Sequence, residues 1–237
     1  MAVIPAALNF PTNTRVVAPP RASLPRIEMY PDSSLAGKWA GWSVEHIPCA
    51  DVKSKIATGW TGKKLVVVDG CTAPITWDGG AITLRGDLAI LSEAGFKTGN
   101  GTSIKSSVAG TKHTMLWIVP SDAKTASGSS LATWTTPIAA QPSYTKPTCA
   151  SGDYGDIRTD NLAITDTDTF IYTPCDMDFS NQVTGFRGQI YAGTTSLPNN
   201  STFVMTAVSV PGVAAQAGSV ASVTATQTAR FDARDTP

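Results

Sequence analysis

Met115-Leu116-Trp117-Ile118-Val119 is a run of five apolar residues that ends at Pro120. The run is too short for a buried helix, and it is rich in the aliphatic and aromatic residues that strands favour. Six similar runs, separated by Gly, Asn, Asp and Pro, occur elsewhere in the chain: 65–68, 82–84, 88–91, 170–172, 189–191 and 203–205. The sequence therefore predicts an all-β fold built from short strands.

The spacing of these runs is regular over much of the chain. The run at 65–68 is followed by that at 88–91 after about 23 residues and by that at 115–119 after a further 27 or so, and the runs at 170–172 and 189–191 are about 19 apart. Recurrence near 20–27 residues is typical of a solenoid in which one structural unit repeats. Pairs such as Gly79-Gly80 and Asn199-Asn200 suit the left-handed backbone of tight corners. We therefore expect a right-handed parallel β-helix over residues 31–213. An antiparallel β-sandwich also makes many short strands and is the alternative.

Three segments fall outside the repeating pattern. Residues 1–30 contain five prolines and are predicted to form a Pro-rich arm. Helix-compatible spacing between Lys38 and Trp60 predicts one short N-terminal helix that stops at Gly59. The Ser/Thr/Pro-rich stretch 121–154 breaks the period and is expected to be an insertion loop, and residues 214–237 are expected to be a C-terminal strand or tail.

The overall composition excludes several classes of protein. The 237 residues include 18 basic and 18 acidic side chains, so the formal net charge is zero and no electrostatic footprint of a nucleic-acid binder is present. The hydrophobic fraction of 42% is too high for a disordered chain. No apolar run approaches the roughly 20 residues that span a membrane, so we expect no membrane span in this chain.

Four cysteines, namely Cys49, Cys71, Cys149 and Cys175, are present without any Cys-x-x-Cys pair. Because zinc and thioredoxin spacings are absent, the even count favours two disulfides in an extracellular or cell-surface protein. The spacing favours Cys49–Cys71 and Cys149–Cys175, although four cysteines allow three pairings. Residues 1–10 lack the features of a signal peptide, so the export segment is expected to be absent from this chain. The alternative is a cytosolic protein with four reduced cysteines in its core.

Aspartates crowd into residues 153–178 and are the candidate chemical groups. Residues two apart on a strand share a face, so Asp166 with Asp168, and Asp176 with Asp178, each form a candidate pair. Such a pair is able to catalyse glycoside hydrolysis or to hold Ca²⁺. The commoner role of Asp in such segments is that of a solvated turn residue, so no catalytic residue, resident metal or cofactor is assigned.

Two aromatic residues in the expected insertion loop are candidate ligand contacts. Trp134 and Tyr144 would be able to stack on sugar rings or to contact a protein partner if their rings were exposed. The alternative is that both rings pack within the loop. A protein or carbohydrate at a surface is therefore the class of partner that the sequence favours.

Five segments carry a family resemblance, and they occur in a fixed order: 87–92, 115–120, 170–175 (FIYTPC), 186–193 (FRGQIYAG) and 208–212. Together they resemble the C-terminal regions of exported actinobacterial proteins of unknown function that begin with a pilin-like membrane segment of the type IV minor-pilin (PilX-type) kind. The likeness covers roughly residues 26–213 and includes counterparts of both cysteine pairs. It implies a surface-exposed β-helical domain associated with pilus or secretion machinery, and it implies no catalytic residues.

The function expected from the sequence is therefore a non-enzymatic structural or adhesion module at the cell surface. One alternative is a carbohydrate-active β-helix, which would act as a polysaccharide lyase or hydrolase or would bind the polysaccharide without cleaving it. A second alternative is a component of a phage or virion fibre, since such fibres also use β-helices.

Overall fold

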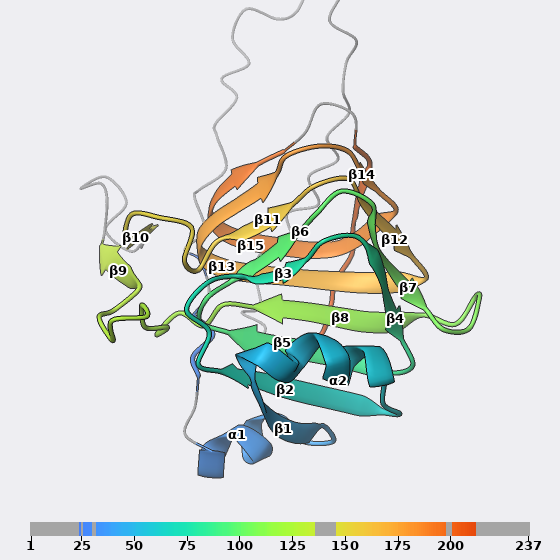
Figure 1. Cartoon of the computed structure of the whole chain (residues 1–237), viewed down its shortest axis with the longest axis horizontal. Coiled ribbons are helices and arrows are strands. Elements are labelled where there is room, and N and C mark those ends of the chain that lie inside the picture. Colours follow the sequence, from blue (N-terminus) through green and yellow to red (C-terminus); the bar gives the residue numbers. More distant parts are fainter. Residues whose placement is uncertain (1–23, 25, 30–31, 136–145, 198–200, 212–237) are drawn as a thin grey trace, which may run out of the picture.

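A computed structural model describes residues 24, 26–29, 32–135, 146–197 and 201–211, and strands dominate it (Figure 1). Six of the seven apolar runs of the sequence lie within a strand, and the seventh, 115–119, extends one residue past the end of its strand. In chain order the elements are α1 (Asp32–Lys38), β1 (Ser43–Pro48), the 3-10 helix η1 (Cys49–Asp51), α2 (Val52–Thr58), β2 (Lys63–Asp69), β3 (Ile75–Trp77), β4 (Gly80–Leu84), β5 (Asp87–Ser92), β6 (Phe96–Thr98), β7 (Thr102–Ser106), β8 (His113–Ile118), β9 (Ala132–Thr135), β10 (Lys146–Cys149), β11 (Ile157–Thr159), β12 (Leu162–Thr165), β13 (Thr167–Phe179), β14 (Val183–Thr184), β15 (Phe186–Ser196) and β16 (Phe203–Met205).

The main sheet has ten strands and curls into a half-barrel (Figure 1). One arm has the order β1-β2-β5-β8-β13 and continues through β15 to β16, whereas the other arm joins β13 to β11, β6 and β3. Strand β13 belongs to both arms, because residues 167–172 pair with β8 and residues 177–179 pair with β11. A separate four-stranded sheet, ordered β14-β12-β7-β4, lies across the remaining side.

Neither architecture predicted from the sequence is correct. The right-handed parallel β-helix is replaced by the curled half-barrel, because successive passes of the chain do not repeat one coil. The pass from β1 to β2 contains helices in place of strands, and the pass after β8 contains an antiparallel hairpin, β9–β10. The antiparallel sandwich is wrong because every pairing within the two larger sheets is parallel.

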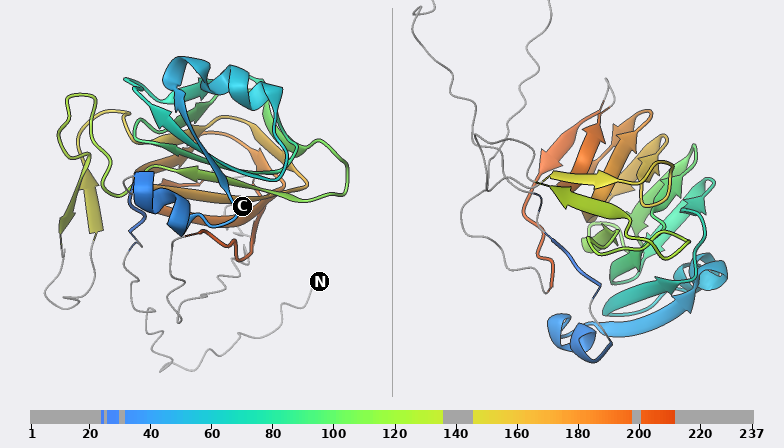
Figure 2. Two further views of the ribbon diagram at one scale, coloured as in Figure 1. Left: turned by 90° about the horizontal axis from the view of Figure 1, so that it is seen from below. Right: turned by 90° about the vertical axis from the view of Figure 1, so that its left-hand side faces the viewer.

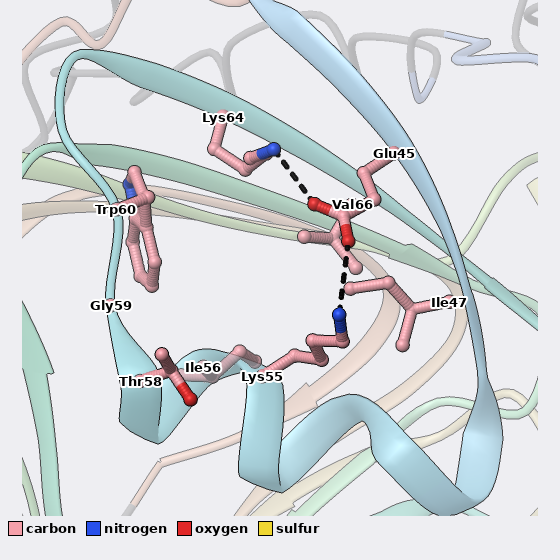
Figure 3. Close-up of a pocket in the computed structure, with 9 residues that line it drawn as sticks. All are labelled: Glu45, Ile47, Lys55, Ile56, Thr58, Gly59, Trp60, Lys64 and Val66. Atoms are coloured by element: carbon pink, nitrogen blue, oxygen red, sulfur yellow. Dashed lines mark hydrogen bonds and ion pairs between the residues drawn. The ribbon is translucent and has the colours of Figure 1, made fainter.

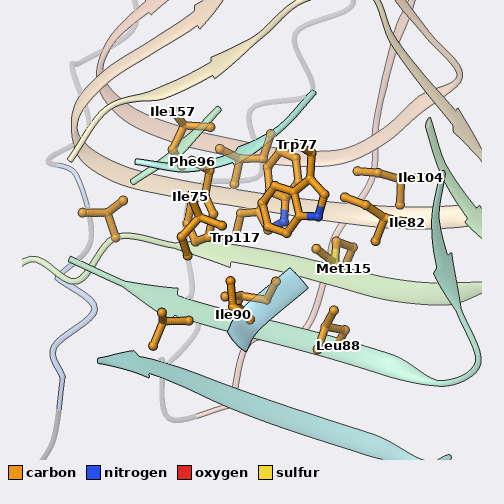
Figure 4. Packing of buried hydrophobic residues seen from close by; sticks show 14 of the residues in the cluster. Ile75, Trp77, Ile82, Leu88, Ile90, Phe96, Ile104, Met115, Trp117 and Ile157 are labelled. Atoms are coloured by element: carbon orange, nitrogen blue, oxygen red, sulfur yellow. The ribbon is translucent and has the colours of Figure 1, made fainter. Parts of the chain in front are cut away.

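Stacked aromatic rings fill the concave side of the half-barrel (Figure 4). Phe96 lies 5.5 Å from Trp117 and 6.5 Å from Trp77, measured between ring centroids, and the rings are nearly parallel. Trp117 is fully buried among aliphatic side chains of both arms. This packing removes a large apolar area from water and joins strands that are distant in the sequence.

The convex side of the first arm is also buried, which explains why its strands are continuous apolar runs. In β2, Val66 and Val68 face the concave core, whereas Leu65 and Val67 face a second core on the convex side. Residues 26–29, helix α1 and residues 208–210 supply the other half of this second core. A parallel sheet covered on both faces has no polar alternation.

Both disulfides favoured by the cysteine spacing are present, Cys49–Cys71 and Cys149–Cys175. The first joins the start of η1 to the end of β2. The second joins the hairpin β9–β10, which lies beside the main sheet within the expected insertion loop, to β13 (Figure 1). Disulfides of this kind are compatible with an extracellular location.

The two ends of the curled sheet differ. Figure 2 shows α2 and β1 in blue at one end and the last strands in orange at the other. At the first end, Val52 and Ile56 of α2 pack into the concave core, and the helix stops at Gly59 as expected from the sequence.

Within the described residues, no helix is long and apolar enough to cross a bilayer.

Candidate functional site

A pocket of about 200 Å³ opens between α2 and the concave face of β1 and β2 (Figure 3). Its volume is below the 300–1,000 Å³ or so that is usual for drug-sized ligands, so it suits a single small ring. Four of its residues are polar, charged or aromatic groups able to contact a ligand: Glu45, Lys55, Trp60 and Lys64. The rest of the wall consists of Ile47, Ile56, Thr58, Gly59 and Val66, and the hydroxyl of Thr58 already donates to the carbonyl oxygen of Ser54.

The strand period places the two polar groups of the sheet on the pocket side. Glu45 alternates with Ile47 in β1, and Lys64 alternates with Val66 in β2, so all four point to the concave face. The parallel register puts Ser43 opposite Lys64 and Glu45 opposite Val66, which brings the glutamate and the lysine diagonally together. Ordinary strand geometry therefore builds one wall of the pocket.

A tight turn builds the opposite wall. Gly59 ends α2 with a φ of +79°, and its N–H donates to the carbonyl oxygen of Ile56 at 3.1 Å. Arg85 covers this turn and donates from Nη1 to the carbonyl oxygen of Thr58 at 3.0 Å. Glycine supplies the left-handed backbone here without steric cost, and the chain then presents Trp60 to the pocket.

Three charged side chains form a cluster across the pocket (Figure 3). Lys64 Nζ lies 2.7 Å from Glu45 Oε2, and Lys55 Nζ lies 3.7 Å from Glu45 Oε1. The hydrogen bond from Lys64 is the main cause that lowers the pKa of Glu45, and it outweighs the opposing effect of burial. Glu45 is therefore a carboxylate acceptor at neutral pH, flanked by two ammonium groups.

Trp60 is held in place by its ring nitrogen. Its Nε1–H donates to the carbonyl oxygen of Asp87 at 3.1 Å, which anchors the indole to the start of β5. The ring is half-buried and stands at one side of the pocket (Figure 3). A fixed indole face loses little conformational entropy when it contacts a ligand.

The four ligand-contacting groups suit a hydroxylated ring with an acidic substituent. A carboxylate accepts hydrogen bonds from hydroxyl groups, and an indole face packs against the C–H face of a sugar ring. The cluster has two cations and one anion. The side chain of Lys55 is 58% exposed, and its Nζ, at 3.7 Å from Glu45 Oε1, is too far away to make a short hydrogen bond with it. Its ammonium group therefore keeps donors available for a ligand carboxylate.

The four candidate aspartates are placed on or beside β13, and their contacts differ. Asp166 Oδ2 accepts from the N–H of Gly110 at 2.9 Å, whereas Asp168 Oδ1 lies 3.1 Å from Nε of Arg187. Asp178 Oδ2 accepts from the hydroxyl of Ser180, and the side chain of Asp176 is exposed. Asp166 has a φ of +50° and occupies a turn before the strand, so it has the turn role of Asp that the sequence also allowed.

The other sequence candidates lie in or near the hairpin. Trp134 is half-buried, Arg26 lies 4.8 Å over its ring, and its Nε1–H donates to the carbonyl oxygen of Ser121. These contacts fit the packing role of Trp134. Tyr144 lies outside the described residues.

Across the part of the chain that is described, no group of three or more His, Cys, Asp or Glu side chains is arranged to hold a metal ion, so the calcium expectation gains no support.

Sequence reasoning missed the pocket residues. Glu45, Lys55 and Lys64 are ordinary charged residues in the sequence, and no spacing motif connects them. The available signal was a charged residue two positions before a core residue in each of two strands, Glu45 before Ile47 in β1 and Lys64 before Val66 in β2. That signal becomes informative only when the parallel pairing of β1 with β2 is known.

Comparisons of the chain with family models, with curated proteins and with solved structures give no match.

Proposed function

We propose that this protein is a non-enzymatic, extracellular binding module that contacts a carbohydrate unit in the pocket beside α2. The observation that carries the proposal is the fixed indole of Trp60 opposite the cluster of Lys55, Glu45 and Lys64. The ligand class is a single sugar ring with an acidic group, such as a uronic acid. This proposal makes the expected adhesion role specific to one site.

Binding is favoured over hydrolysis by the groups in the pocket. Glycoside hydrolysis in its usual form needs two carboxyl groups, one of them protonated. Among the described residues that line the pocket, one has a carboxyl group, Glu45, and its lowered pKa keeps it ionised. The arrangement therefore supplies an acceptor and two donors for recognition rather than an acid and a nucleophile.

Extracellular location is part of the proposal and is supported by the two disulfides. The described residues contain no free cysteine, which fits an oxidising compartment. An association with pilus or secretion machinery rests on the sequence resemblance alone.

Calorimetric titration of the protein with glucuronate and with glucose tests the proposal. We expect glucuronate to bind with a Kd on the order of millimolar, as is reasonable for one small ring, and glucose to bind more weakly. Replacing Lys55 with methionine removes a donor for the ligand carboxylate, so Lys55→Met should weaken glucuronate binding roughly tenfold, which corresponds to one charge-assisted hydrogen bond.

Lys53→Met is the matched control for this experiment. Lys53 is an exposed lysine of the same helix but does not line the pocket, so its variant should bind glucuronate as the unmodified protein does. Equal losses in the two variants would mean that general charge, and not the pocket, attracts the ligand. Absence of binding to both sugars would refute the proposed ligand class.

A further inference from the structure

The arm of the main sheet that runs from β1 to β16 has two edges, and they are protected to different degrees. At the first edge, β1 carries Glu45, His46 and Pro48, which are residue types that discourage pairing with another strand. At the other edge, the pairing of β16 among the described residues is with residues 186–188 of β15. Within the described residues, no strand pairs with the free side of residues 190–196, although β15 continues to Ser196.

The core also ends differently at the two edges. Helix α2 covers the core at the β1 end through Val52 and Ile56, which are almost fully buried. At the β15–β16 end, the last core side chains are only half-buried, namely Ile190, Ala192 and Phe203. Large apolar side chains next to them are exposed: Leu197 by 57%, Val204 by 44% and Met205 by 53%.

This end of the molecule also carries little charge. The described residues from Gly188 to Pro211 include no Asp, Glu, Lys, Arg or His, and the neighbouring Arg187 of β15 is paired with Asp168 at 3.1 Å. Soluble proteins usually place lysine or proline on an exposed edge to prevent association. Because Arg187 is already paired with Asp168, two copies of this end are able to approach without the desolvation of an unpaired ion.

We propose that the β15–β16 end, defined by the free edge of residues 190–196 and the exposed Leu197, Val204 and Met205, is the surface through which two copies of this chain associate. The edges of β15 pair across a twofold axis, so that each copy satisfies the backbone groups that the other leaves open. The second copy also covers the apolar side chains that no described element covers. The pockets beside α2 lie at the opposite ends of such a dimer and stay accessible.

Sedimentation equilibrium of the full chain tests the oligomeric state, and hydrogen exchange locates the contact. We expect a monomer–dimer equilibrium between about 1 and 100 μM, because association depends on concentration. Over the same range, amide exchange in a peptide covering residues 189–197 should slow with rising concentration, while exchange in β1 should not change. The proposal is overturned if the chain stays monomeric across this range, or if amide exchange at 189–197 does not change with concentration. Either result is expected if residues 212–237 of the same chain, or another protein, cover this surface.

Lysine substitutions then test the surface itself. Leu197→Lys and Thr195→Lys each place a charge on the proposed contact and should raise the dimer dissociation constant at least about tenfold. Val108→Lys is the matched control, because Val108 is also 57% exposed but lies in the turn after β7. Circular dichroism and thermal unfolding confirm that each variant is folded. If the dimer persists in both edge variants, or weakens equally in the control, the assigned surface is wrong.

Discussion

At the scale of single residues, the surroundings decide whether a carboxyl group is held in its charged or its neutral form. Glu45 and Asp156 provide opposite cases. Glu45 sits between two lysines, which lower its pKa, whereas burial is the main cause that raises the pKa of Asp156. Asp156 precedes β11, and its Oδ1 accepts from the backbone N–H of Asp176 at 3.2 Å. It therefore links two strands at the cost of burying a carboxylate.

The raised pKa of Asp156 has a consequence for stability. The folded protein holds the Asp156 proton more tightly than the unfolded chain, so the contribution of this group to the free energy of unfolding falls as pH rises from the unfolded pKa through the folded one. Asp156→Asn keeps an acceptor oxygen and cannot ionise. Relative to the unmodified protein, the variant should therefore gain stability as pH rises across this window.

Urea denaturation at a series of pH values between about 3 and 7 measures this difference. The midpoint of the variant should rise relative to that of the unmodified protein with increasing pH. The opposite trend would show that the ion pair of Asp156 with Arg158, whose Nη2 lies 3.3 Å from Oδ2, outweighs burial.

At the scale of elements, the Cys49–Cys71 disulfide ties the start of η1, and through it α2, to the end of β2. Its sequence separation of 22 residues is close to the 26 residues of Cys149–Cys175. Chain-entropy arithmetic gives about 3 kcal/mol of stabilisation for loops of this size. Because the first disulfide alone borders the element that forms the pocket, the two should have similar effects on stability and different effects on binding.

Replacing both cysteines of one pair with alanine separates these effects. We expect each double variant to lose about 3 kcal/mol in urea denaturation. Glucuronate binding should weaken in Cys49→Ala/Cys71→Ala, because α2 is held less firmly, and should be kept in Cys149→Ala/Cys175→Ala. Undiminished binding in the first variant would mean that α2 is positioned by Val52 and Ile56 alone.

The elements also show what the sequence is able to predict. Short apolar runs located β2, β5, β8 and part of β13, because a strand buried on both faces needs no other signal. They also marked β4, β15 and β16, but they missed the other nine described strands, most of which are short. Gly59 located the end of α2 for a similar local reason. Helix α1 was not predicted, since Leu35 and Trp39 bury their side chains against the convex side of a sheet formed by distant residues.

At the scale of the whole molecule, the regular spacing of strands was misleading. The spacing of the apolar runs gives the number of residues between two strands that pair in parallel. It does not give the number of strands that the intervening chain adds to the sheets. The run 170–172 marks three residues of β13, whereas the strand has 13 residues and carries the sheet from one arm into the other. Pro174 and the change of register after Thr173 accompany this passage, and neither is distinctive in the sequence.

The candidate site was beyond prediction for the same reason. Its walls come from β1, β2 and α2, and the charged cluster exists only because β1 and β2 pair in parallel at one particular register. The aspartates and Trp134, which stood out in the sequence by density and residue type, have separate partners in the structure.

Two-dimensional ¹H–¹⁵N NMR with glucuronate shows whether the pocket beside α2 binds an acidic sugar, as we propose. We expect the Trp60 indole N–H and the amides of Lys55, Gly59 and Lys64 to shift together and to saturate with one Kd. Shifts confined to the hairpin around Trp134 or to the aspartates of β13, or no shift at all, would rule out this pocket as the binding site.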